Sequence, residues 1–142
     1  MPKKILWLDN EPRMIEPFVL ILRDEGYEVD VAPTLQRADY LLKTKRYNLL
    51  LLDVMIPTLD EEEEMRYSPD RTDFGLKTGL VFYEVNRSLL DAASTQVLVM
   101  TMRMDKDIFE EFVAAGLPET CISTKLEMSE VNTFIEKIES LI

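Results

Sequence analysis

Five short runs of apolar residues divide the chain, and a helical pattern follows each of them. The runs occupy residues 5–8, 27–31, 49–52, 97–100 and 121–124. An uninterrupted apolar run such as 49–52 is typical of a strand buried on both faces, whereas the alternating run 27–31 predicts a strand at the edge of a sheet. Five consecutive strand–helix units predict an α/β fold: a doubly wound, five-stranded parallel sheet of (βα)5 topology with helices on both faces.

Three of the helical patterns begin after a residue that can cap a helix. Thr34 precedes a pattern with apolar residues within 38–42, Asp107 precedes the pattern 108–115, which Gly116 ends, and Ser129 precedes the last pattern, with apolar residues within 131–138. A hydroxyl or carboxylate oxygen at the capping position accepts a hydrogen bond from a free backbone N–H of the first turn. We therefore expect these three helices to start directly after Thr34, Asp107 and Ser129.

The length and the charge of the chain limit what it can do. The 142 residues suffice for one domain, and we expect residues 1–142 to form it. The chain has 16 Lys and Arg residues against 27 Asp and Glu residues, a formal net charge of −11. An acidic surface repels phosphate backbones, which argues against nucleic acid as a partner and favours a divalent cation or a basic protein surface.

The scarcity of cysteine, the absence of histidine and the lack of long apolar runs argue against several classes of protein. Cys121 is the only cysteine, so no disulfide can form within the chain, and we expect the reducing cytoplasm as its location. No run approaches the roughly 18 apolar residues of a membrane helix, and the start of the chain lacks the apolar stretch of a signal peptide. Histidine is absent, which excludes catalytic His pairs and His-ligated zinc within this chain.

Residues 58–78 interrupt the alternation of strands and helices. They contain seven acidic and three basic residues, a net charge of −4. The run Glu61–Glu64 favours a solvated loop that repels itself into an extended form. The alternative hypothesis is that the insert folds back beside Asp53, with Tyr67 and Phe74 as aromatic anchors, and acts as a lid, a source of a metal ligand or a selector of partners.

Polar residues stand at the carboxyl ends of four predicted strands. They are Asp9, Asp53, Thr101 and Lys125. In a parallel sheet these ends lie on one rim, where ligands bind, so we expect the four side chains to converge. Neighbouring carboxylates repel each other unless a cation lies between them, and oxygen ligands suit Mg²⁺. Asp53 is then a candidate nucleophile toward phosphorus, with the other groups available to hold the phosphoryl oxygens.

The same residues carry a resemblance to a known family. The chain resembles the CheY-like receiver domains of bacterial two-component response regulators, which have a flavodoxin-like fold. The segments that carry the resemblance are ILWLDNEP (5–12), LLLLDVMIP (49–57), VLVMT (97–101) and STK (123–125). The likeness covers the whole chain apart from the insert that follows the strand ending at Asp53.

The resemblance implies a role for each of these residues. Asp53 would be the phosphoacceptor, Thr101 the switch hydroxyl and Lys125 the lysine that pairs with the phosphoryl group. Met55 and Arg103 would flank that group and tune the access of water. The cofactor would be Mg²⁺, held by Asp9, Asn10, Asp53 and the backbone carbonyl of Met55.

The function implied is that of a stand-alone response regulator and not of a metabolic enzyme. A sensor histidine kinase or a phosphotransfer protein would supply the phosphoryl group, and the receiver would catalyse only its own phosphorylation and dephosphorylation. Phosphorylation would switch binding to a downstream protein target or relay the phosphoryl group, and a homodimer is a possible form.

Two alternatives remain open at this point. Asn10, Met102 and Leu126 stand where the family commonly has an acid, a small residue and a proline, and they favour a pseudo-receiver that only docks other proteins. The second alternative is a haloacid-dehalogenase-type phosphohydrolase, which needs an Asp-x-Asp pair. Asp53 is followed two positions later by Met55, and Asp9 by Glu11, so neither is the required pair, although Asp9 and Glu11 come close to it.

Overall fold

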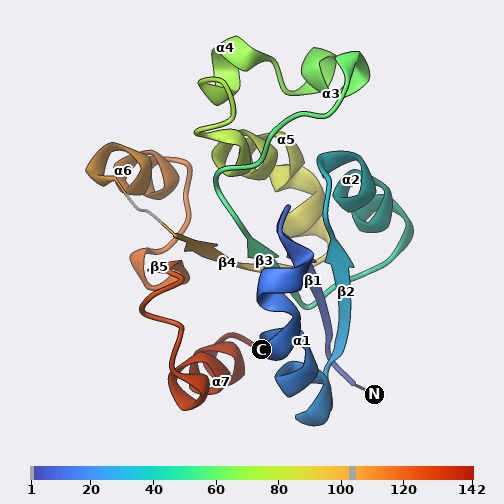
Figure 1. The fold of residues 1–142 in the computed structure, drawn as a ribbon, viewed down its shortest axis with the longest axis vertical. Helices are drawn as coiled ribbons and strands as arrows, with labels where there is room; N and C mark the ends of the chain where they lie inside the picture. Colours follow the sequence, from blue (N-terminus) through green and yellow to red (C-terminus); the bar gives the residue numbers. More distant parts are fainter. Residues whose placement is uncertain (1, 103–104) are drawn as a thin grey trace.

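The computed structural model describes residues 2–102 and 105–142, and within them all five predicted strands are present (Figure 1). The strands pair in parallel in the order β2-β1-β3-β4-β5, so the predicted sheet is confirmed. The alternating strand β2 lies at the edge, as its pattern predicts. Their bounds are β1 (Lys4–Leu8), β2 (Glu28–Ala32), β3 (Leu49–Leu52), β4 (Gln96–Thr101) and β5 (Ile122–Thr124).

Helices cover both faces of the sheet because successive strand residues point to opposite sides. Leu6 and Leu8 of β1 belong to the core on one side, and Ile5 and Trp7 to the core on the other. The first core is covered by α2 (Leu35–Thr44), α5 (Thr78–Ala92) and α6 (Lys106–Ala114), and the second by α1 (Pro12–Asp24) and α7 (Val131–Leu141). A short 3-10 turn, η1 (Glu119–Cys121), precedes β5.

One of the three predicted helix caps is confirmed. The prediction for Asp107 is wrong, because α6 begins at Lys106 and Asp107 lies within its first turn. The Thr34 side chain accepts a hydrogen bond from the backbone N–H of Arg37 at the start of α2. The prediction for Ser129 is wrong: the carboxylate of Glu130 caps α7 and accepts from the backbone N–H groups of the first turn. The Ser129 hydroxyl instead donates to the carbonyl of Leu126, 2.7 Å away.

The insert is helical, so the prediction of an extended, solvated loop over Glu61–Glu64 is wrong. Residues 58–78 contain two short helices, α3 (Glu61–Arg66) and α4 (Pro69–Thr72), which lie above α5 at the top of Figure 1. Asp60 caps α3 by accepting from the backbone N–H of Glu63. The glutamates occupy the first turn of α3, where the positive end of the helix dipole stabilises negative charge.

Contacts with α2 and α5 hold the insert in place. The buried carboxylate of Glu63 accepts from the backbone N–H of Gln36, in the first turn of α2, at 2.8 Å. The Tyr67 hydroxyl donates to the buried carboxylate of Asp39 at 2.9 Å, and Asn86 of α5 completes the cluster. The hypothesis of an aromatic anchor is therefore confirmed for Tyr67. It is wrong for Phe74, whose backbone turns the ring outward and leaves it 82% exposed.

Candidate functional site

The sheet places Asp9 and Asp53 next to each other. Asp9 directly follows β1 and Asp53 directly follows β3, and these neighbouring strands are in register through Leu8 and Leu52. β1 pairs with β2 on one side and β3 on the other, so the chain reverses its strand order here. In open α/β sheets this switch point is where ligands bind, beyond the carboxyl ends of the strands.

Asp9 is fully buried, and both its carboxylate oxygens are engaged. Oδ1 accepts a hydrogen bond from the backbone N–H of Glu11 at 2.9 Å. Oδ2 accepts from the Lys125 ammonium at 2.6 Å, a contact between residues 116 positions apart in the chain. Charge-assisted hydrogen bonds of this kind fix the orientation of both side chains.

The two carboxylate oxygens of Asp53 differ in how tightly their contacts hold them. Its Oδ1 accepts from the backbone N–H of Val54 at 2.8 Å, and its Oδ2 lies 3.5 Å from the Lys125 ammonium. The residue is only 6% exposed. Burial, with a further contribution from the nearby charge of Asp9, raises the pKa of Asp53 from 3.8 to about 6, against the opposing effects of Lys125 and the Val54 N–H. Asp53 is therefore mostly ionised at neutral pH, with a carboxylate oxygen beside an ammonium group.

Lys125 lies in the turn directly after β5, and its ammonium contacts both carboxylates. Its backbone N–H donates to the carbonyl of Thr101 at 2.7 Å, which fixes the start of its side chain against the end of β4. Burial lowers the pKa of its ammonium, but the hydrogen bond to Asp9 and the charges of Asp53 and Asp9 outweigh burial, so the pKa is raised. Lys125 is charged throughout the neutral range as a result.

Three other predicted residues lie at or just beyond the ends of the strands. Thr101 is fully buried at the last position of β4. Asn10 is half-buried in the bend after Asp9, and Met55 is 40% exposed two residues after Asp53. Arg103, predicted to flank the phosphoryl group, lies outside the described residues.

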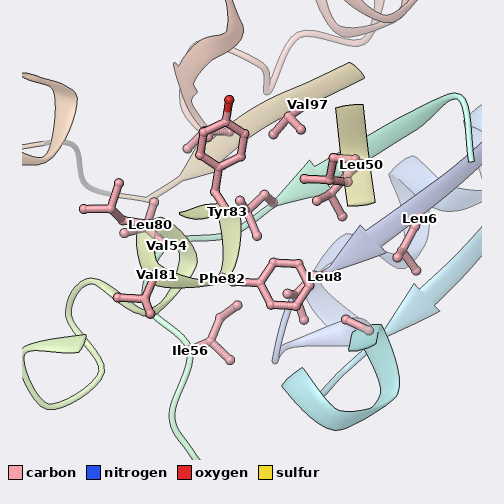
Figure 2. Packing of buried hydrophobic residues seen from close by; sticks show 14 of the residues in the cluster. Leu6, Leu8, Leu50, Val54, Ile56, Leu80, Val81, Phe82, Tyr83 and Val97 are labelled. Carbon is pink, nitrogen blue, oxygen red and sulfur yellow. The ribbon is translucent and has the colours of Figure 1, made fainter. Parts of the chain in front are cut away.

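The segment after Asp53 is anchored by α5. Val54 and Ile56 are buried beside Leu80, Val81 and Phe82, as Figure 2 shows. This packing leaves the intervening Met55 to point outward.

Gly79, at the start of α5, is a positioning residue that the sequence patterns did not single out. Its N–H donates to the carbonyl of Val54 at 2.8 Å. A Cβ at this position would lie 2.2 Å from the carbonyl oxygen of Asp53. Only glycine lets the helix approach the Asp53 backbone this closely. The signal available in the sequence was a glycine within a helical pattern. Glycine lowers helix stability there, so its presence indicates that packing requires it.

The donor set fits one hard divalent cation. Two buried carboxylates face one ammonium, so the cluster keeps an uncompensated negative charge. Within residues 2–102 and 105–142 no group of three or more His, Cys, Asp or Glu side chains gathers around one point. This does not conflict with Mg²⁺, which is commonly bound by one or two carboxylates and keeps several of its waters. The carboxylates of Asp9 and Asp53 are therefore chemically suitable donors for Mg²⁺.

Comparison with known proteins agrees with this fold. No protein-family model matches the sequence. Over 82 residues the chain is 34% identical to the transcriptional regulatory protein CrdR of Helicobacter pylori; the match covers 58% of this chain and 38% of that protein. The chain thus matches well under half the length of this curated relative.

Solved structures match nearly the whole chain. A CheY-like receiver domain protein from Methanospirillum hungatei superposes with a TM-score of 0.73 at 21% identity, over 99% of this chain and 93% of that chain. The chemotaxis protein CheY4 of Vibrio cholerae gives a TM-score of 0.73 at 18% identity over the full length of both chains. A Burkholderia pseudomallei response regulator, solved with a phosphorylated aspartic acid and a calcium ion, gives 0.63 at 17% identity, over 97% of this chain and 72% of that one.

Among the described residues, no helix has the length and apolar character needed to cross a membrane.

Proposed function

We propose that this chain, whose fold is that of CheY-like response regulator receiver domains, acts in two-component signalling as a phosphoacceptor. Asp53 takes a phosphoryl group from the phosphohistidine of a sensor histidine kinase or a phosphotransfer protein. The observation that carries the proposal is the Lys125 ammonium between two buried carboxylates at the ends of adjacent strands.

The transfer uses the loosely held oxygen of Asp53. Oδ1 is tied to the Val54 N–H, while the contact that Oδ2 makes among the described residues is the 3.5 Å one with Lys125. In the reaction a carboxylate oxygen bonds to phosphorus, the bond from phosphorus to the histidine nitrogen breaks, and its electron pair returns to the imidazole ring. The carboxylate must be ionised to attack. A pKa of about 6 meets this condition at neutral pH.

Lys125 and Thr101 would hold the transferred group. The Lys125 ammonium would pair with a phosphoryl oxygen in place of its contact with Asp53, and the Thr101 hydroxyl would donate to another. Mg²⁺ bound by Asp9, Asp53 and the Met55 carbonyl would add positive charge against the phosphoryl oxygens. Asn10, beside Asp9, would line the same metal pocket.

The new negative charge provides the switch. A phosphoryl group on Asp53 would draw Lys125 and Thr101 toward it, and these residues follow β5 and end β4. Their movement would shift β4, α6 and β5 and so change how the chain binds a downstream protein target. The same chemistry would allow relay of the phosphoryl group to another protein. In this role the chain catalyses only its own phosphorylation and dephosphorylation, in the cytoplasm where kinases act.

The experiment is incubation with Mg²⁺ and acetyl phosphate, followed by intact mass spectrometry. We expect a gain of one phosphoryl group that is absent in Asp53→Asn and present in the matched control Asp24→Asn, at an exposed aspartate at the end of α1. No gain in the wild-type chain would contradict the proposal and leave the docking role of a pseudo-receiver. A gain that persists in Asp53→Asn would place the acceptor elsewhere.

A further inference from the structure

A groove of about 480 Å³ lies beside the Asp53 segment, on the side of the insert. It is lined by residues within 54–55, 73–77 and 105–108, which belong to the loop after β3, the end of the insert and the start of α6. We call it the insert groove. Asp9, Asp53 and Lys125 do not line it, whereas Met55, whose carbonyl is proposed above as a donor to Mg²⁺, does.

Apolar side chains form part of the groove and are accessible in it. Leu76 is 54% exposed and Met55 is 40% exposed, while Ile108 lies buried at its base. Exposed apolar residues that line a groove together, and do not occur singly, mark surfaces that bind another molecule.

The charge around these apolar residues is mainly negative. Asp73 and Asp107 line the groove, and within residues 2–102 and 105–142 the basic residue that lines it is Lys77. The Lys77 ammonium already pairs with Glu111 of α6, 3.2 Å away. The groove therefore offers a negative rim to an occupant that carries positive charge.

An exposed aromatic ring, that of Phe74, lies next to groove-lining residues in a turn with a strained backbone. Asp73, Phe74 and Gly75 are three consecutive residues with positive φ, 52°, 53° and 93°. Such φ values are unfavourable for residues with side chains, above all for a bulky one such as Phe74. The turn nevertheless holds the Phe74 ring in solvent between two groove-lining residues of the chain, Asp73 and Leu76.

We propose that the insert groove and Phe74 bind a protein segment that carries arginines beside large apolar side chains. An arginine suits the groove because its apolar stem can lie along Leu76 and Met55 while its guanidinium pairs with Asp73 or Asp107. A second copy of this chain fits less well, because two chains of net charge −11 repel each other. The proposal concerns the unmodified chain and does not depend on phosphorylation of Asp53.

The experiment uses two labelled peptides of equal positive charge, one with leucines between its arginines and one with serines in their place. Fluorescence anisotropy should show at least about tenfold tighter binding of the leucine peptide. Leu76→Ser and Asp107→Asn should each weaken that binding by about tenfold. Both side chains are exposed or at the surface, so these variants should fold.

Matched controls test whether binding is specific to the groove. Leu20→Ser on α1 changes an exposed leucine elsewhere, and Glu28→Gln removes one negative charge at the far end of the sheet. Both should bind the leucine peptide as the wild type does, and amide shifts in NMR spectra should change near 54–55, 73–77 and 105–108.

Three results would overturn the proposal. Equal affinity for both peptides would mean that charge alone drives the binding. Unchanged affinity in Leu76→Ser and Asp107→Asn would place the binding site elsewhere. A dimer in sedimentation velocity that Leu76→Ser dissociates would assign the groove to a second copy of the chain. Each outcome is independent of the acetyl phosphate experiment, since no phosphodonor is present.

Discussion

Replacement of Asp53 by asparagine should stabilise the metal-free fold at neutral pH. Burial raises the pKa of Asp53 from 3.8 to about 6, so the folded state holds this proton more tightly than the unfolded state does. The stabilisation from the protonated form is complete below pH 3.8 and is lost as the pH rises through about 6. The difference corresponds to about 3 kcal/mol, and asparagine, which never ionises, avoids this loss.

The assay is urea unfolding in EDTA at several pH values from acid to neutral, followed by the fluorescence of Trp7. Trp7 is the only tryptophan of the chain and is buried in the core. The free energy of unfolding of Asp53→Asn minus that of the wild type should grow between about pH 4 and pH 6 and stay constant above. At its plateau it should reach about 3 kcal/mol in favour of the variant.

The exposed Asp24→Asn variant is the control, because its difference from the wild type should stay within about 0.5 kcal/mol across the same range. An Asp53→Asn variant less stable than the wild type at neutral pH would refute the reasoning. A difference that does not vary with pH would do the same, since it would show that the ionisation of Asp53 costs nothing in the fold.

Three other substitutions test how the site and the insert are held, each by urea unfolding. Gly79→Ala should lower stability by about 2 kcal/mol, because its Cβ would lie 2.2 Å from the Asp53 carbonyl oxygen, and a more stable variant would contradict this. Tyr67→Phe should cost about 2 kcal/mol, since buried Asp39 loses a hydrogen bond; no change would mean that the bond is absent in solution. Phe74→Gly should raise stability by about 1 kcal/mol, because glycine accepts a φ of 53° without strain, and a loss would show that the ring packs against the protein.

Local patterns predicted the sheet because the burial of a strand determines which of its consecutive residues are apolar. The run 49–52 is apolar at every position, and only a central strand covered on both faces needs that pattern. The predicted convergence of Asp9, Asp53 and Lys125 relied on the same regularity, because carboxyl ends of parallel strands meet on one rim. The roles proposed for these residues remain predictions until the phosphodonor experiment is done.

The insert shows where local patterns fail. A run of four glutamates predicts repulsion and extension, yet Glu63 is buried in a helix because its carboxylate accepts backbone N–H groups from Gln36 and Leu59. Local patterns also missed the role of Gly79. A side chain is excluded at this position by the backbone of Asp53, which lies 26 positions earlier in the chain.

The sequence by itself determined the five strand–helix units, the parallel sheet and the polar residues at the strand ends, because these follow from the order of apolar and polar residues along short segments. Only the tertiary structure decided that Lys125 lies closer to Asp9 than to Asp53, how deeply Asp53 is buried, and how the insert folds onto α2. Burial and ion pairing depend on groups that are distant in the chain, so no local pattern carries them.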